Sequence, residues 1–146
     1  MRLIVVLIAT VLFCSQCTER QETAGADAAQ VTSVFKPVAD VRQVMTAITI
    51  PSSTAIFGAA SETPKDDKDW DSVHNNALAL AESGNLLIMP GRAVDNDVWI
   101  KEAQAMTEAA MLAVKAAEAK NADGVIDAGD KIYATCESCH LKYMKQ

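Results

Sequence analysis

The most specific chemical pattern in this sequence is a run of five residues close to the C-terminus: Cys136, Glu137, Ser138, Cys139 and His140. Two thiols three positions apart lie on one side of a helical turn, so both can form thioether bonds with the two vinyl groups on one edge of a porphyrin. The histidine that follows directly supplies a nitrogen ligand to the iron. A C-x-x-C-H pentapeptide is typical of covalent haem c attachment, and the sequence predicts one such group here.

Other interpretations of the pentapeptide explain it less completely. A structural zinc site usually has four ligands, and the body of the chain has no second cluster of cysteine and histidine. A thioredoxin-like pair would follow a strand at the start of a helix, whereas this pair lies near the end of a helical pattern. The remaining alternative is a helical lipoprotein in which Cys136 and Cys139 form a structural disulfide, but it leaves His140 without a role.

The N-terminal segment predicts export. Met1 and Arg2 precede a strongly apolar run from Leu3 to Phe13. This run is shorter than the ~20 residues that a membrane-spanning helix needs, and it fits the apolar part of a secretory signal. We therefore expect residues 1–17 to be a signal peptide, residues 18–33 to be a flexible linker, and the mature protein to be periplasmic.

Two processing patterns compete after the apolar run. Cys17 is followed by a polar stretch and is a candidate for an N-terminal lipid that anchors the protein to a membrane, although Cys14 and Gln16 depart from the residues that usually precede a lipidated cysteine. Cleavage within Ala24-Gly25-Ala26 would instead release a soluble form. Cys14 and Cys17 form a second C-x-x-C, but Thr18 follows them in place of histidine, so we expect a single haem.

Composition favours one all-α domain over residues 34–146. Half of the residues are hydrophobic, yet only three Phe, two Trp and two Tyr are present, so alanine, methionine and aliphatic residues supply most of the apolar content. Such a balance favours helices over a β-sandwich. The formal net charge of −6 argues against nucleic acid and for redox proteins with a basic surface as partners.

Apolar residues recur at helical spacing in four segments. The first stripe is Val34, Val38, Val41, Met45 and Ile48, and we expect this helix to begin near Pro37. Pro51 then either kinks the helix or begins a second short one. We expect further helices over residues 70–83, with Gly84 at the C-cap, from about 96 to 120, and from 121 or 123 onward. The last has one face formed by Val125, Gly129, Ile132, Cys136, Cys139 and Tyr143.

Four helices joined by short connections favour an up-down-up-down four-helix bundle with the haem attached to the C-terminal helix. A C-x-x-C-H on the last helix of such a domain resembles the class II c-type cytochromes, the cytochrome c′ family and its low-spin methionine-ligated relatives. The resemblance covers about residues 35–143 and also rests on Tyr143 and on Arg42-Gln43, whereas Met144 stands where the family often has arginine. It implies a periplasmic monohaem protein that exchanges single electrons with redox partners, and homodimers are familiar in the family.

The residue opposite His140 separates two functions that this resemblance implies. In the low-spin branch a methionine of the first helix ligates the iron and the protein carries electrons. In the cytochrome c′ branch an apolar residue leaves a five-coordinate iron that binds nitric oxide or carbon monoxide. Met45 is the candidate ligand, because its height along the first helix matches that of His140 along the last. Met89 is the next candidate, and Met106 suits core filling.

Two further side chains could meet the haem. His74 is the only other histidine, and we expect a solvated or rim position for it in preference to ligation of the iron. Arg92 follows Pro90-Gly91 and suits either pairing with a haem propionate or an ordinary surface position. The sequence contains no Gly-rich phosphate loop and no catalytic triad spacing, so we expect no enzymatic activity.

Overall fold

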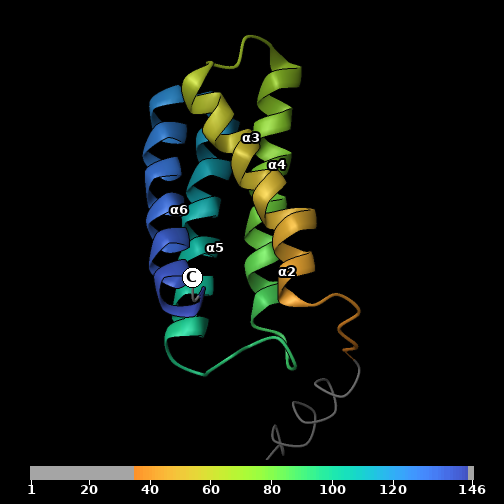
Figure 1. Ribbon diagram of the computed structural model, residues 1–146. Helices are drawn as coiled ribbons and strands as arrows, with labels where there is room; N and C mark the ends of the chain where they lie inside the picture. The colour runs from red at the N-terminus through yellow and green to blue at the C-terminus, as the bar shows by residue number, and fades with distance from the viewer. Residues whose placement is uncertain (1–34, 145–146) are drawn as a thin grey trace, which may run out of the picture.

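Four helices packed against each other make up residues 35–144, the part of the chain that this computed structural model describes (Figure 1). The first helix contains α2 (Val41–Val44), a π turn η1 (Met45–Thr49) and α3 (Ile50–Ser61), and the others are α4 (Asp67–Leu87), α5 (Val98–Glu118) and α6 (Ala122–Tyr143). These described residues contain no strand, so the prediction of an all-α fold is confirmed. The first helix contacts α4 and α6, and α5 contacts the same two helices on its own side.

The first helix begins four residues later than the sequence pattern predicts. Asp40 is its N-cap: the Asp40 side chain accepts the backbone N–H of Gln43 at 2.8 Å, and the Gln43 side chain accepts the backbone N–H of Asp40 at 2.9 Å. This reciprocal capping box satisfies two backbone donors that a helix start leaves unpaired. It fixes the start at Val41, and Pro37 lies in the non-helical stretch before it.

The π turn explains how the first helix continues past a proline. The backbone N–H of Ile50 donates to the carbonyl of Met45, five residues earlier instead of four. Pro51 follows directly, and a proline has no N–H and crowds the carbonyl four residues before it. Because the wider turn takes up one extra residue, the helix continues to Ser61, and Pro51 modifies the helix without ending it.

The second helix is longer than predicted, because Gly84 is not its cap. α4 begins after Asp66, whose side chain accepts the N–H of Asp69 at 3.0 Å, and it ends at Leu87. Gly84 is buried inside it against α5, where an added methyl group would lie 2.8 Å from the carbonyl oxygen of Ala103. A glycine that permits close helix contact was therefore mistaken for one that ends a helix. The predicted start of the last helix is confirmed, since Asn121 accepts the N–H of Gly124 at 3.1 Å.

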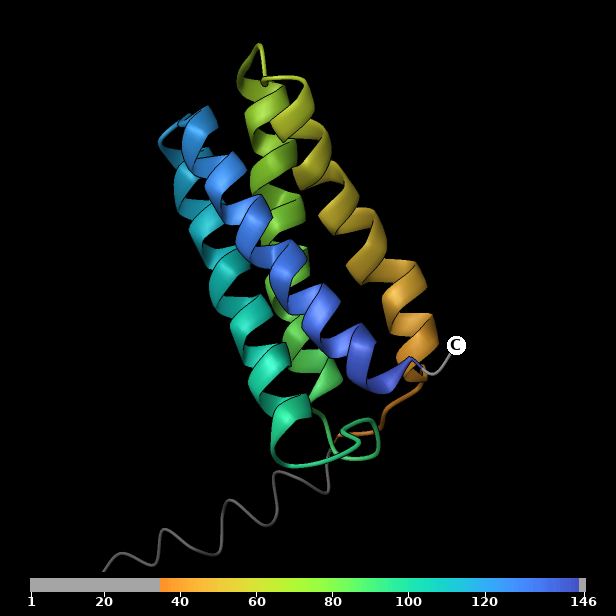
Figure 2. The same cartoon turned by 60° about the vertical axis from the view of Figure 1, so that its left-hand side comes forward.

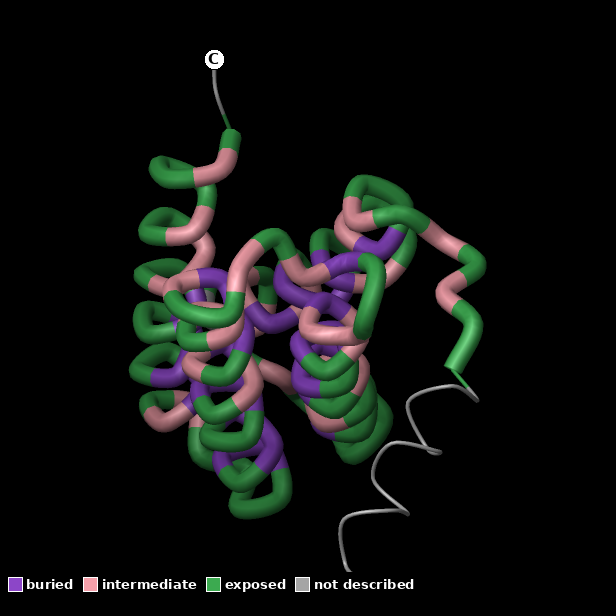
Figure 3. The backbone as a smooth tube through the Cα atoms, turned by 90° about the horizontal axis from the view of Figure 1, so that it is seen from below, coloured by how far each residue is buried: buried purple, intermediate pink, exposed green. Residues whose placement is uncertain are grey.

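Alanines make up many of the buried residues between α4, α5 and α6. Buried residues lie on the helix sides that face one another, and exposed residues lie on the outer sides (Figure 3). The hydrophobic residues of these three helices with no exposed surface are Ala77, Leu80, Ala110, Ala113 and Ile132. Among residues 35–144, no helix is long and apolar enough to cross a membrane. The start of α2 and the end of α6 lie at the same end of the molecule (Figure 2), which brings the first and last helices together around the predicted site.

Candidate haem site

The three residues of the predicted attachment motif lie in the last two turns of α6. Cys136 and Cys139 are half-buried, and His140 is exposed. Both cysteines are free thiols, with no disulfide between them. All three side chains line one cavity of about 220 Å³ between the first helix and α6. The thiols and the imidazole therefore face a shared space on one side of the helix.

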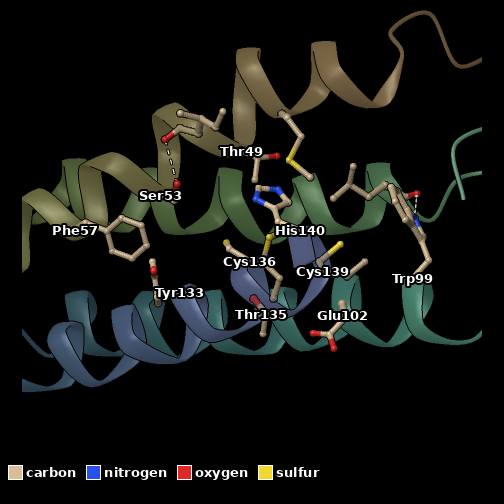
Figure 4. Close-up of a pocket in the computed structure, with 15 residues that line it drawn as sticks. Thr49, Ser53, Phe57, Trp99, Glu102, Tyr133, Thr135, Cys136, Cys139 and His140 are labelled. Atoms are coloured by element: carbon tan, nitrogen blue, oxygen red, sulfur yellow. Dashed lines mark hydrogen bonds between the residues drawn. The ribbon is translucent and has the colours of Figure 1, made fainter. Parts of the chain in front are cut away.

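The opposite wall of this cavity comes from the first helix. Met45, Thr49 and Ile50 belong to this wall, and α5 contributes Trp99 and Met106. In Figure 4, Thr49 on the first helix lies across from His140 on α6. A second cavity of about 560 Å³ also has Met45, Ile50, Trp99, Cys139 and His140 in its wall, and it extends to Val94 and Met144. The two cavities meet around His140 and together form a mostly apolar space that reaches the protein surface.

The π turn places two side chains of the first helix at this space. Met45 begins the turn and Thr49 ends it, and both line the 220 Å³ cavity. In a regular α-helix, residues four apart are nearly in line, whereas the wider turn changes the direction of every side chain that follows. π turns are frequent at functional sites for this reason. The local distortion that accommodates Pro51 thus shapes the wall that faces His140.

The environment of the two cysteines keeps their thiols protonated. Burial raises the pKa of the Cys136 thiol above its ordinary value. Burial also raises the pKa of the Cys139 thiol, with a further contribution from the negative charge of Glu102. Redox-active cysteines of the thioredoxin type have lowered pKa values, so these two thiols lack the property that such chemistry requires.

A hydrogen-bonded cluster holds the end of α6 against the start of α5. The Tyr143 hydroxyl donates to one carboxylate oxygen of Asp95, and the other oxygen accepts the backbone N–H of Trp99 at 3.0 Å. The rings of Tyr143 and Trp99 meet edge to face with centroids 5.0 Å apart. The hydrogen bond from Tyr143 lowers the pKa of Asp95 to about 2, while partial burial and the same bond raise the pKa of Tyr143 to about 12. This cluster lies one helical turn after His140, and it holds the end of α6 in place.

No protein-family model, curated protein or solved structure matches this chain. The assignment of a function therefore rests on the residues of the site.

The structure brings Met45 together with the attachment motif, but not Met89 or His74. Met89 follows α4 and its sulfur accepts a hydrogen bond from Arg92 at 3.2 Å. His74 lies near Glu118, with 3.5 Å between the imidazole nitrogen and the carboxylate oxygen, and lines neither cavity. Cys17 lies outside the described residues.

Arg92 is not the ordinary surface arginine that the sequence allowed. It is only 7% exposed, and its guanidinium donates to the carbonyl oxygens of Ala39 at 2.9 Å and Leu86 at 3.0 Å. It lines neither of the two cavities, and its pairing with a haem propionate stays a prediction. A buried guanidinium needs such partners, and here it ties the segment before α2 to the end of α4.

Several cavity residues were not predicted from the sequence. One of them is Glu102, an acidic residue one helical turn after Trp99. Its carboxylate accepts a hydrogen bond from the Ser138 hydroxyl at 2.7 Å. Thr49 lies four residues after Met45, and this spacing could have indicated a shared face. Met106 was predicted to fill the core; it is 4% exposed and also reaches the cavity, so the chain places two methionine sulfurs near this space.

The residues present fit a covalently attached haem. The two thiols are unpaired and half-buried, the imidazole faces the same cavity, and most of the remaining lining is apolar. Residues 35–144 contain no group of three or more His, Cys, Asp and Glu side chains arranged to hold a metal ion by themselves. An iron that arrives within a porphyrin needs only one or two protein ligands, which matches this donor set.

Proposed function

We propose that this protein is a monohaem c-type cytochrome that carries single electrons and is not an enzyme. The observation that carries the proposal is the shared cavity, in which Cys136, Cys139 and His140 on α6 face Met45 on the first helix. A bound haem supplies an iron that alternates between two oxidation states. The protein's part is to hold that iron, to choose its ligands and to limit its contact with water.

Each residue of the site has a distinct part in this proposal. Cys136 and Cys139 would hold the ring through thioether bonds, and His140 would give a nitrogen ligand to the iron. Met45 would give a sulfur ligand, which favours the reduced iron and raises the reduction potential. The apolar wall that includes Ile50 acts in the same direction, because it disfavours the additional positive charge of the oxidised state.

The proposal includes an up-down-up-down order of the four helices, with the haem on the last. Short connections over residues 62–66 and 119–121 support this order, as do the contacts between successive helices α4, α5 and α6. The contact of the first helix with both α4 and α6 is the closure that such a bundle requires. In this arrangement Met45 and His140 lie at the same height.

We place this electron carrier in the periplasm, on the evidence of the N-terminal sequence alone. Residues 1–17, including Cys17, lie outside the described part of the structure. A lipid on Cys17 would hold the protein at a membrane, and mass spectrometry of the mature N-terminus distinguishes this form from one cleaved after Ala26. The net charge of −6 favours redox partners with a basic surface.

Covalent haem is the decisive test of this function. The full chain is produced in a bacterial periplasm that has haem-attachment machinery, and acid-acetone extraction followed by a pyridine haemochrome spectrum measures the haem that stays on the protein. We expect one haem per chain in the wild type and in the motif control Ser138→Ala, and none in Cys136→Ala/Cys139→Ala. A wild type that retains no haem would contradict the proposal and favour the helical lipoprotein with a disulfide.

The identity of the distal ligand has its own test. We expect the wild type to have a low-spin ferrous spectrum and to bind carbon monoxide slowly. Met45→Ala should become high-spin and bind carbon monoxide rapidly, while the matched control Met106→Ala, which alters the same cavity from α5, should remain low-spin. The reverse result would identify Met106 as the ligand, and rapid binding by the wild type would favour the gas-binding alternative.

A further inference from the structure

Thr49 carries a buried hydroxyl group that the proposed haem ligation does not use. Thr49 is 4% exposed, and within residues 35–144 its Oγ1 has no hydrogen-bond partner. Helical threonines often donate to the carbonyl four residues earlier. Thr46 and Thr54 in the same helix do so, to Arg42 at 2.6 Å and Ile50 at 2.7 Å. Thr49 is the exception, and its donor is free for another molecule.

The free hydroxyl faces the cavity. Thr49 lines it, and in Figure 4 its side chain points from the first helix toward His140. A buried hydroxyl without a partner costs free energy, since it has lost its hydrogen bonds to water and gained none in return. We therefore expect this donor to find an acceptor inside the cavity.

A second hydroxyl lies one helical turn further along the same wall. Ser53 is 8% exposed and lines the same cavity. Its hydroxyl donates to the carbonyl of Ile50 at 3.1 Å, so its oxygen keeps a lone pair that can accept. Thr49 thus offers a donor and Ser53 offers an acceptor on one face of the helix. This combination suits a molecule that both accepts and donates, and it disfavours an anion, which could only accept.

We propose that Thr49 and Ser53 form a subsite that holds one water molecule inside the cavity, on the side that faces His140. The inference rests on the proposed function, because it concerns the protein with its haem attached. A buried water needs two to four polar partners, and these two hydroxyls meet the lower limit. Thr49 is then a positioning residue, which acts on the iron through the water that it holds.

Such a water would affect the reduction potential. A water held by a fixed hydroxyl can direct its oxygen toward positive charge, and it then stabilises the oxidised iron more than the reduced iron. Loss of the water should therefore raise the potential. A direct hydrogen bond from Thr49 to the sulfur of Met45 would have the opposite effect, because it would withdraw electron density from the ligand and favour the reduced iron. The sign of the shift separates the two arrangements.

The test uses the full chain with covalent haem and two kinds of measurement. A high-resolution crystal structure of the wild type should show an ordered water within about 3 Å of Thr49 Oγ1. Redox titration should give a higher potential for Thr49→Val, which keeps the shape and removes the hydroxyl, and for Thr49→Ala. Thr49→Ser should restore the wild-type potential, and Thr54→Val, an exposed threonine of the same helix, should not change it.

The outcomes are distinguishable from a failure of the proposed function. A wild type without covalent haem overturns both proposals. With haem attached, the inference alone is overturned if no water lies at Thr49, if Thr49→Val leaves the potential unchanged, or if the potential falls. If the valine and alanine variants do not mature, the wild-type crystal structure still decides whether the water is present.

Discussion

The interface between α4 and α5 and the space between the first helix and α6 are built by the same chain in opposite ways. At the first interface, Gly84 and buried alanines such as Ala103 and Ala110 let the helices approach until no methyl group can be added at Gly84. At the second, larger side chains such as Met45 and Ile50 line cavities that reach the surface. The comparison shows that small residues let two helices approach closely at Gly84, whereas larger side chains border open space around Met45.

The largest expected difference between the two regions comes from truncating a side chain in each. Leu80 is 0% exposed in α4, so Leu80→Ala should lower the free energy of unfolding by about 2–5 kcal/mol, because the surrounding core cannot collapse fully into the space. Ile50 is 51% exposed and already borders cavities. Ile50→Ala in the haem-free protein should therefore change the free energy of unfolding by only about 0.5 kcal/mol. Urea unfolding followed by circular dichroism measures both. Equal losses would mean that the two regions are packed alike.

Adding a methyl group at a glycine should have opposite effects in the two regions. Gly84→Ala should destabilise the protein by about 1–3 kcal/mol, since the new carbon would meet the Ala103 carbonyl and the Thr107 hydroxyl. Gly58 in α3 has nothing within 4 Å of an added carbon, so Gly58→Ala should stabilise the protein by about 0.5–1 kcal/mol through helix propensity. Melting temperatures report the sign directly. A Gly84→Ala protein as stable as wild type would show that α4 and α5 can move apart to accommodate the added methyl group.

A smaller effect on the free energy of unfolding should depend on pH, through the hydrogen bond between Tyr143 at the end of α6 and Asp95 before the start of α5. The pKa of Asp95 is lowered to about 2, so its contribution to stability is present above its ordinary value near 4 and is lost as the pH falls from there toward 2. The pKa of Tyr143 is raised to about 12, so its contribution is present below about 10 and is lost as the pH rises toward 12.

Tyr143→Phe tests this junction, because it removes the hydroxyl and keeps the ring against Trp99. The stability difference from wild type should be constant between about pH 5 and 9 and should shrink at both extremes. Urea unfolding at a series of pH values measures it, with Tyr133→Phe as the control, since Tyr133 is 59% exposed. A difference that does not depend on pH would contradict the role of the Asp95 carboxylate.

The smallest expected effect is at the surface of α6. Ser138→Ala removes a hydrogen bond of 2.7 Å to Glu102, but Ser138 is exposed and water can replace the lost partner. The free energy of unfolding should change by less than about 0.5 kcal/mol. A larger loss in thermal unfolding would show that this bond, and not only the Tyr143 cluster, fixes α6 against α5.

The sequence predicted the regular parts of this fold because helix formation leaves a periodic trace. Asn121 starts α6 as expected, since a capping side chain acts on backbone only three residues away. Gly84 was misinterpreted because its role depends on a neighbouring helix. Asp40 and Gln43 have the spacing of a capping box, so the sequence also contained the true start of the first helix. The predicted start near Pro37 followed the apolar pattern instead.

The site was predictable where it rests on contiguous residues and less so elsewhere. Cys136, Cys139 and His140 are recognisable by spacing alone, and Met45 by its height on the first helix. The buried hydroxyl of Thr49 and the carbonyl partners of Arg92 depend on how distant segments meet, which no local pattern records. That Cys136, Cys139 and His140 hold a haem, and that Met45 ligates its iron, both stay predictions.

The π turn at Met45–Thr49 shifts the side-chain register of the first helix, so the segments before and after it follow different registers. One residue is inserted relative to a regular α-helix, and each residue rotates the helix by about 100°, so positions before the turn and after it follow separate registers. A relative whose first helix is regular would align with this chain only if a one-residue gap is placed between positions 45 and 50. Deleting Ala47 would remove the inserted residue, so the helix could become regular while the positions on both sides of the deletion keep their present neighbours.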